Sequence, residues 1–264
     1  WTGGQFALSK NFGATWSSAS GSFGGVIANN ISISESGKSW ATVDNNGNVY
    51  TSNDYATTWT KMSAVSGSSL NSVCMTTDGS IIYVGGITGI YKITNGVSSL
   101  IYTNPASNSL SKMSCSGNGQ YILASNNSSA SDYLYLSTNG GTSFSQVATS
   151  KNWSGVSVST SGQYMAACVS GEYIYTSVNY GTTWTVALTS ASNGWQSIVM
   201  GGNGQFIYAI SPWGYVYAYS TSVPTIQTTQ ISNPGKGSMY FDEATNRLYV
   251  YNSTSSAWKY ITLA

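Results

Sequence analysis

A repeat of about 42 residues runs through the chain and constrains its fold more than any other feature. In each repeat an apolar segment ends in a glycine turn, and a second apolar segment follows at once. The turn glycines are spaced by 42, 40, 43 and 42 residues, at Gly37, Gly79, Gly119, Gly162 and Gly204. A segment centred on tyrosine recurs at similar spacing, at Tyr50, Tyr91, Tyr135, Tyr175 and Tyr217. The sequence therefore predicts five complete repeats between residues 29 and 230.

Each repeat contains four short segments, which we call A to D in chain order. They alternate apolar and polar residues and are bounded by Gly, Asn, Asp and Ser, a pattern typical of β-strands. Four strands in every repeat of this length are typical of a β-propeller blade. A blade buries both of its faces only against neighbouring blades, so the units must pack around an axis. We therefore predict an all-β fold, a β-propeller of four-stranded blades.

The two ends of the chain supply incomplete repeats. Residues 1–21 contain only segments C and D, and residues 231–264 contain three further predicted strands. Pairing the N- and C-terminal strands would complete one more blade and remove two free sheet edges. We predict a single β-propeller domain over residues 1–264 with six blades, and seven blades as the alternative. Residues 231–264 would either close the ring or form a short docking tail.

A motif of eight residues connects segments C and D. It reads Ser-x-[Asn/Asp]-x-[Gly/Ala]-x-[Thr/Ser]-[Trp/Phe] and occurs at residues 9–16, 52–59, 137–144 and 177–184. The Asn or Asp side chain can accept N–H groups of its own turn, and glycine permits a positive φ. The aromatic residue can then fold under the hairpin and bury a large apolar surface. We interpret this motif as a device that stabilises the fold.

The motif resembles the Asp-box, or bacterial neuraminidase repeat, of sialidase-like and sortilin-like propellers. The resemblance covers residues 1–230 and implies the propeller fold, although Asn replaces the usual Asp in three of the four copies. In sialidases, three arginines bind the substrate carboxylate. Arg247 is the only arginine of this chain, so we expect no sialidase activity. The segment that begins at Gly237 is similar to short C-terminal segments of viral and phage fibre proteins.

Composition excludes several kinds of chemistry. The chain has no histidine, which excludes Ser-His-Asp triads and histidine metal ligands. Its net charge is +1 and only 6% of its residues are charged, so we expect no nucleic-acid partner. No apolar run is long enough for a membrane span, and the three cysteines form no CxxC pair. We predict no cofactor, no metal site, no catalytic residue and no membrane insertion.

In a propeller, the D–A and B–C connections share one face, and the A–B and C–D turns share the other. The D–A and B–C segments vary most between repeats, and functional residues usually lie on such loops. The candidate ligand-binding residues on these segments are Trp153, Trp195, Trp213, Tyr215, Asp132 and Glu172. An exposed tryptophan such as Trp213, beside Pro212, suits stacking on a sugar ring.

Each candidate also has a structural interpretation. Trp153 and Trp195 align with Leu70 and Leu110 at the start of segment A, which favours the core. Asp132 and Glu172 precede segment C in successive repeats and fit solvated turns equally well.

These features favour a non-enzymatic binding protein at the extracellular or virion surface. Its expected partner is a glycan or a cell-surface glycoprotein, bound through one propeller face. Two alternatives remain open. Asp132 and Glu172 would serve as the paired carboxylates of a glycoside hydrolase, or the chain would be a structural module of a larger surface assembly that docks through its C-terminal strands.

Overall fold

The computed structural model describes residues 7–9, 11, 13–18, 28–62, 65, 69–104, 110–126, 132–188, 194–212 and 216–220, and the backbone of C-terminal strands over 229–231, 239–242, 247–252 and 257–262. The regular elements in these ranges are β-strands, as the sequence predicts. The described residues contain no helix that could cross a lipid bilayer.

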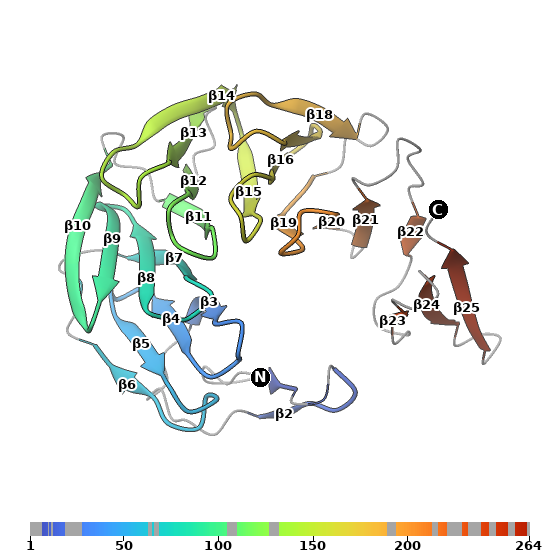
Figure 1. The fold of residues 1–264 in the computed structure, drawn as a ribbon, viewed down its shortest axis with the longest axis horizontal. Helices are drawn as coiled ribbons and strands as arrows, with labels where there is room; N and C mark the ends of the chain where they lie inside the picture. Colours follow the sequence, from blue (N-terminus) through green and yellow to red (C-terminus); the bar gives the residue numbers. More distant parts are fainter. Residues whose placement is uncertain are drawn as a thin grey trace.

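Five four-stranded antiparallel sheets form the blades of a propeller (Figure 1). Blades 1 and 2 contain β3 (Ala28–Ile33), β4 (Trp40–Asp44), β5 (Val49–Ser52) and β6 (Thr60–Lys61), then β7 (Leu70–Met75), β8 (Ile81–Gly86), β9 (Gly89–Thr94) and β10 (Val97–Thr103). Blades 3 and 4 contain β11 (Leu110–Cys115), β12 (Ile122–Asn126), β13 (Asp132–Ser137) and β14 (Ser145–Lys151), then β15 (Trp153–Val158), β16 (Met165–Val169), β17 (Ile174–Ser177) and β18 (Thr185–Leu188). Blade 5 contains β19 (Ser197–Met200), β20 (Phe206–Ile210), β21 (Val216–Ser220) and β22 (Thr229–Ile231).

The prediction of six or seven blades was wrong, because the structure has five. The terminal strands pair locally: β1 (Ala7–Leu8) with β2 (Ser17–Ser18), and β23 (Met239–Asp242) with β24 (Arg247–Asn252), which also pairs with β25 (Ala257–Thr262). No pairing joins these two sheets among the described strands. Local hairpins close short loops, whereas a composite blade must join strands from opposite ends of the chain, which costs more conformational entropy.

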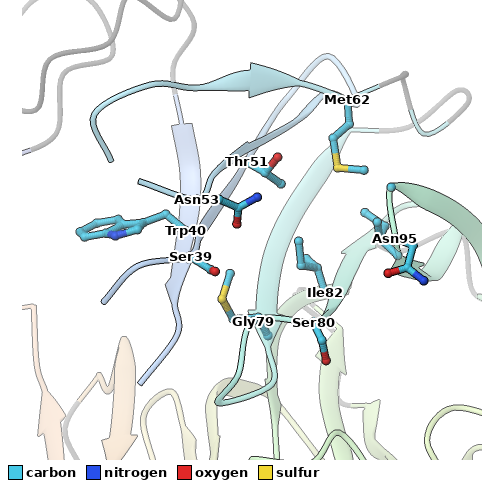
Figure 2. Close-up of a pocket in the computed structure, with 12 residues that line it drawn as sticks. Ser39, Trp40, Thr51, Asn53, Met62, Gly79, Ser80, Ile82 and Asn95 are labelled. Carbon is cyan, nitrogen blue, oxygen red and sulfur yellow. The ribbon is translucent and has the colours of Figure 1, made fainter. Parts of the chain in front are cut away.

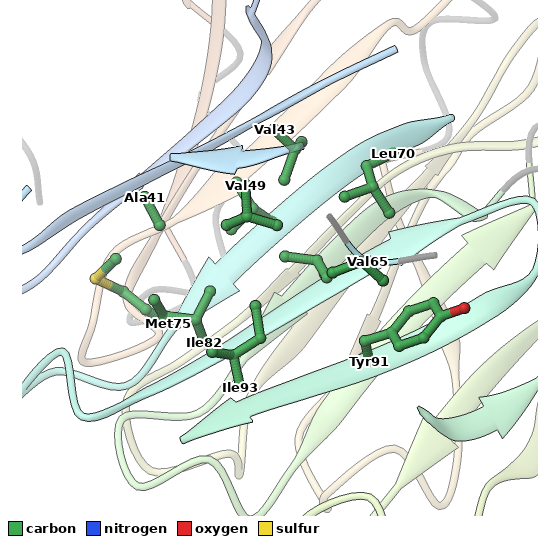
Figure 3. Close-up of a cluster of buried hydrophobic side chains, with 11 residues drawn as sticks. Ala41, Val43, Val49, Val65, Leu70, Met75, Ile82, Tyr91 and Ile93 are labelled. Atoms are coloured by element: carbon green, nitrogen blue, oxygen red, sulfur yellow. The ribbon is translucent and has the colours of Figure 1, made fainter. Parts of the chain in front are cut away.

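Four hydrophobic cores lie between neighbouring blades, one at each of the four boundaries. Figure 3 shows the first, in which Ala41, Val43 and Val49 of blade 1 face Leu70 and Ile82 of blade 2. The second strands of blades 2, 3 and 4 (β8, β12 and β16) thus place alternate side chains into two different cores. Burying one side chain of this size stabilises the fold by about 1.5–3 kcal/mol.

Backbone hydrogen bonds connect the A–B turns of successive blades on the inner rim. The N–H of Glu35 donates to the carbonyl of Thr77 (2.9 Å), and the N–H of Thr77 donates to that of Gly117 (2.9 Å). The N–H of Gly117 donates to the carbonyl of Thr160 (2.8 Å), and the N–H of Thr160 donates to the carbonyl of Gly202 (2.8 Å). These bonds recur at the repeat spacing and fix the position of each blade relative to the next.

The C–D motif hairpins contain the turn bonds that the sequence predicts. In blade 4 the Asn179 side-chain oxygen accepts the Thr183 N–H (3.0 Å), and the Ser177 hydroxyl accepts the Gly181 N–H (3.0 Å). The indole N–H of Trp184 donates to the Gly181 carbonyl (3.1 Å), so the ring folds back under the hairpin. Because Gly181 has a φ of 79°, glycine is suited to this position.

The one aspartate copy of the motif predicts a pH effect. The hydroxyl and N–H of Thr58 and the hydroxyl of Ser52 donate to the Asp54 carboxylate and lower its pKa to about 2. Because the pKa of Asp54 is lower in the folded state, its ionised carboxylate stabilises the fold at pH values above about 3.9, the pKa in the unfolded chain. This contribution to stability is lost as the pH falls toward 2. In Asp54→Asn the hairpin should persist, as it does with Asn179. We expect the urea midpoint of the wild type to fall more steeply than that of the variant between about pH 4 and about pH 2. Equal slopes would contradict this role of Asp54.

Candidate functional site

Three charged side chains lie on the face of blades 3 and 4 that the D–A and B–C connections form, which we call the loop face. Asp132 begins β13 and is the register partner of Lys151, which ends β14. Glu172 lies in the turn between β16 and β17 of the next blade, and its Oε2 is 2.5 Å from Lys151 Nζ. This is the only ion pair among the described residues. We call Asp132, Lys151 and Glu172 the charged loop cluster.

Hydrogen bonds hold the Asp132 carboxylate in place. It accepts the side-chain amide of buried Asn126, the N–H of Tyr133 (2.7 Å) and the hydroxyl of Tyr135 (3.1 Å). Burial is the largest cause of a raised pKa at Tyr135, and the Asp132 charge adds to it. The pKa of neighbouring Tyr102 is raised to about 12, mainly by burial, with smaller effects of Tyr135 and Asp132. Both phenols therefore stay protonated at neutral pH.

Glu172 is held by Lys151 and by a tyrosine. The hydroxyl of Tyr175 donates to Glu172 Oε2 (3.4 Å), and Lys151 Nζ lies 5.4 Å from the centroid of the Tyr175 ring. The hydrogen bond to Glu172 is the largest cause of the raised pKa of Lys151, so the ammonium stays charged. The Glu172 side chain is 42% exposed, which leaves its carboxylate accessible to a ligand.

The same arrangement of tyrosine and carboxylate recurs in two successive repeats. Asp132 and Glu172 each precede the tyrosine of strand C by three residues, and each accepts that tyrosine's hydroxyl. Asp44, in blade 1, also contacts the strand-C tyrosine of its blade, Tyr50, but it is 1% exposed and accepts two N–H groups and the amide of Asn48 within its own turn. On the loop face, the carboxylates of Asp132 and Glu172 thus combine fixed positions with partial exposure.

Trp153 and Trp195 lie in the core and not at the surface. Their exposed fractions are 3% and 1%, and their rings pack edge-on against Tyr175 and Tyr217. The indole N–H of Trp195 donates to the backbone carbonyl of Glu172 (3.1 Å). Neither ring offers a face to a ligand, so the expectation of ligand contact gives way to the structural interpretation. Their role near the site is to support it, since Trp195 fixes the turn that carries Glu172.

Trp213 and Tyr215 lie outside the described residues, and their predicted ligand contacts remain predictions.

The sequence reasoning missed Lys151, Asn126, Tyr135 and Tyr175 as parts of the site. The available signal was the repeated spacing between acid and tyrosine. In the described part of the chain, no group of three or more Asp, Glu or Cys residues is arranged to hold a metal ion.

Comparison with known proteins adds no family assignment. No protein-family model matches the sequence, and no curated protein matches it either. The function must therefore be argued from the residues and their geometry.

Proposed function

We propose that this chain is a non-enzymatic propeller that binds a glycan or a cell-surface glycoprotein through its loop face. The observation that carries the proposal is the charged loop cluster. In a chain with only 6% charged residues, the loop face of blades 3 and 4 carries Asp132 and the Lys151–Glu172 ion pair, and tyrosine hydroxyls orient both carboxylates. Fixed carboxylates and an ammonium group supply the acceptors and donors that sugar hydroxyls require.

The low charge of the chain, in which neutral residues make up most of the polar side chains, supports a location at an extracellular or virion surface. The C–D motif hairpins support a relationship to Asp-box propellers, because Asn179 makes the turn bonds expected of the Asp-box aspartate. These two inferences are part of the proposal.

A glycoside hydrolase is the weaker alternative. Such enzymes need one carboxyl group that donates a proton and a second that is ionised. Here an ammonium group pairs with the charge of Glu172 at 2.5 Å, and three donors occupy Asp132. Both carboxylates are arranged as hydrogen-bond acceptors, which suits binding better than proton transfer.

One observation favours a second candidate, a module of a larger surface assembly. The strands β23–β25 form a three-stranded sheet of their own and follow blade 5 around the ring (Figure 1). If this sheet docks to a partner, removing residues 232–264, which leaves β22 complete, should abolish assembly and leave the five blades folded. Unfolding of the truncated chain would instead show that the segment stabilises the propeller.

Binding to a panel of immobilised glycans tests the main proposal. We expect selective binding that weakens by about tenfold or more in Glu172→Gln and in Lys151→Met, because each loses a charge-assisted hydrogen bond. Matched controls are Glu35→Gln and Lys38→Met, which alter exposed residues of an A–B turn. Unchanged affinity in both cluster variants would contradict the proposal. Turnover of glycosides that disappears in Asp132→Asn or Glu172→Gln would establish the hydrolase instead.

A further inference from the structure

A pocket lies between blades 1 and 2 on the opposite face, which the A–B and C–D turns form. Its volume is about 290 Å³. Blade 1 contributes Ser39, Trp40, Thr51, Asn53 and Met62, and blade 2 contributes Met75, Gly79, Ser80, Ile82, Ile93, Asn95 and Gly96. Figure 2 shows Met62 and Ile82 on opposite sides of the pocket, with Asn53 and Asn95 at its flanks.

The repeat is broken at this boundary in two ways, and the first concerns the C–D hairpin. In blade 4 the motif hairpin reaches back to blade 3: an added Cβ at Gly181 would meet Leu136 at 2.5 Å, and Tyr180 stacks on Tyr121 at 5.1 Å. Blade 2 has no such motif. Its strands β9 and β10 are joined by the two-residue turn Asn95–Gly96, with φ values of 50° and 77°. This shorter hairpin leaves space beside blade 1.

The second break concerns the residue that follows each A–B turn glycine by two positions. Tyr121 lies against the turn glycine of the next blade, where an added Cβ at Gly162 would meet its ring at 2.1 Å, and Tyr164 lies against Gly204 in the same way. In blade 1 this position is Ser39, beside Gly79. A serine stands where a tyrosine ring fills the corresponding space in blades 3 and 4, and the space stays open.

The lining of the pocket defines the chemistry of its ligand. Met75, Ile82 and Ile93 are buried and form an apolar floor that belongs to the first inter-blade core. Asn53, Asn95 and Ser80 form an exposed polar rim, and the amides of Asn53 and Asn95 hydrogen bond to no other described residue. No lining residue is charged. The pocket thus offers apolar contact on one side and neutral donors and acceptors on the other.

We infer that this pocket binds one ring of a neutral sugar. A pyranose has the matching division, since its C–H face is apolar and its edge carries hydroxyl groups that donate and accept hydrogen bonds. The C–H face would rest on the methionine and isoleucine side chains, and Asn53 and Asn95 would bond the hydroxyls from two sides. The site is separate from the charged loop cluster, and the inference does not depend on the proposed function.

Methyl NMR of methionine-labelled protein tests this inference directly. Of the six methionines, Met62 and Met75 line the pocket, and Met113, Met165 and Met200 lie elsewhere as internal references. The labelled full chain is titrated separately with glucose, galactose, mannose and N-acetylglucosamine. We expect at least one sugar to shift the Met62 and Met75 signals and to leave the three reference signals unchanged.

Two kinds of variant decide whether the shift reports the pocket. Ser39→Tyr introduces the residue found at the equivalent position of blades 3 and 4, so it should fill the pocket, keep the fold and abolish the shift. Asn53→Ala, at a residue without positive φ, should weaken binding by about five- to tenfold, which is the effect of one neutral hydrogen bond. Gln120→Ala removes an exposed amide from an A–B turn outside the pocket and should change nothing. The absence of any shift with all four sugars, or shifts that persist in Ser39→Tyr, would overturn the inference.

Discussion

Replacing Trp195 by alanine is expected to lower the free energy of unfolding by about 3–5 kcal/mol. The ring is 1% exposed and packs with Ile198 and Ile207 of blade 5 against Ala166 and Cys168 of blade 4. Its removal leaves a cavity between two blades and deprives the Glu172 carbonyl of its indole donor. Urea unfolding followed by far-ultraviolet circular dichroism measures the loss.

Trp16 is the matched control for this substitution. It is 65% exposed, so Trp16→Ala should cost about 1 kcal/mol or less. The comparison separates the two interpretations that the sequence left open for the tryptophans of the loop segments. A Trp195→Ala variant with unchanged stability but weaker glycan binding would contradict the core position and restore a direct ligand contact.

The second large effect is expected at the A–B turn of blade 4. Gly162 has a φ of 80°, where an alanine is strained by about 1–2 kcal/mol. An added Cβ would also lie 2.1 Å from the Tyr121 ring of blade 3, and such overpacking costs about 1–3 kcal/mol more. Gly162→Ala should therefore lower the free energy of unfolding by about 2–5 kcal/mol, which denaturant unfolding measures.

Gly37 provides a control at the same turn position of blade 1. Its φ is 71°, but an added Cβ would meet no atom within 4 Å. Gly37→Ala should cost only the backbone strain of about 1–2 kcal/mol. The difference between the two variants measures the contact between blades. Equal losses would show that the A–B turns do not pack against the preceding blade as the structure has them.

The sequence alone was sufficient to predict the blades, because each blade repeats the same physical pattern. Gly37 and Gly162 mark equivalent turns with positive φ, and the alternation around Tyr135 and Tyr175 marks equivalent strands. The fate of the terminal strands was not predictable in this way. A strand pattern shows which face is buried but does not select a partner among several similar edges.

The site was only partly predictable, because it depends on contacts between neighbouring blades. The spacing of Asp132 and Glu172 before their tyrosines was visible in the sequence, but the ion pair of Lys151 with Glu172 follows from the packing of blade 3 against blade 4. The alignment of Trp195 with Leu110 correctly indicated burial. The pocket at Ser39 had a sequence signal too, namely the missing C–D motif in blade 2.

The central claim is that the loop face at blades 3 and 4 holds the ligand. Hydrogen–deuterium exchange, read by mass spectrometry with and without a glycan selected from the panel, tests it most directly. We predict slower exchange in peptides that contain Asp132, Lys151 and Glu172, and unchanged exchange in the A–B turns at Gly119 and Gly162, which lie outside the pocket of blades 1 and 2. Unchanged exchange around Asp132 and Glu172 with a bound glycan, or protection confined to the A–B turns, would contradict the account.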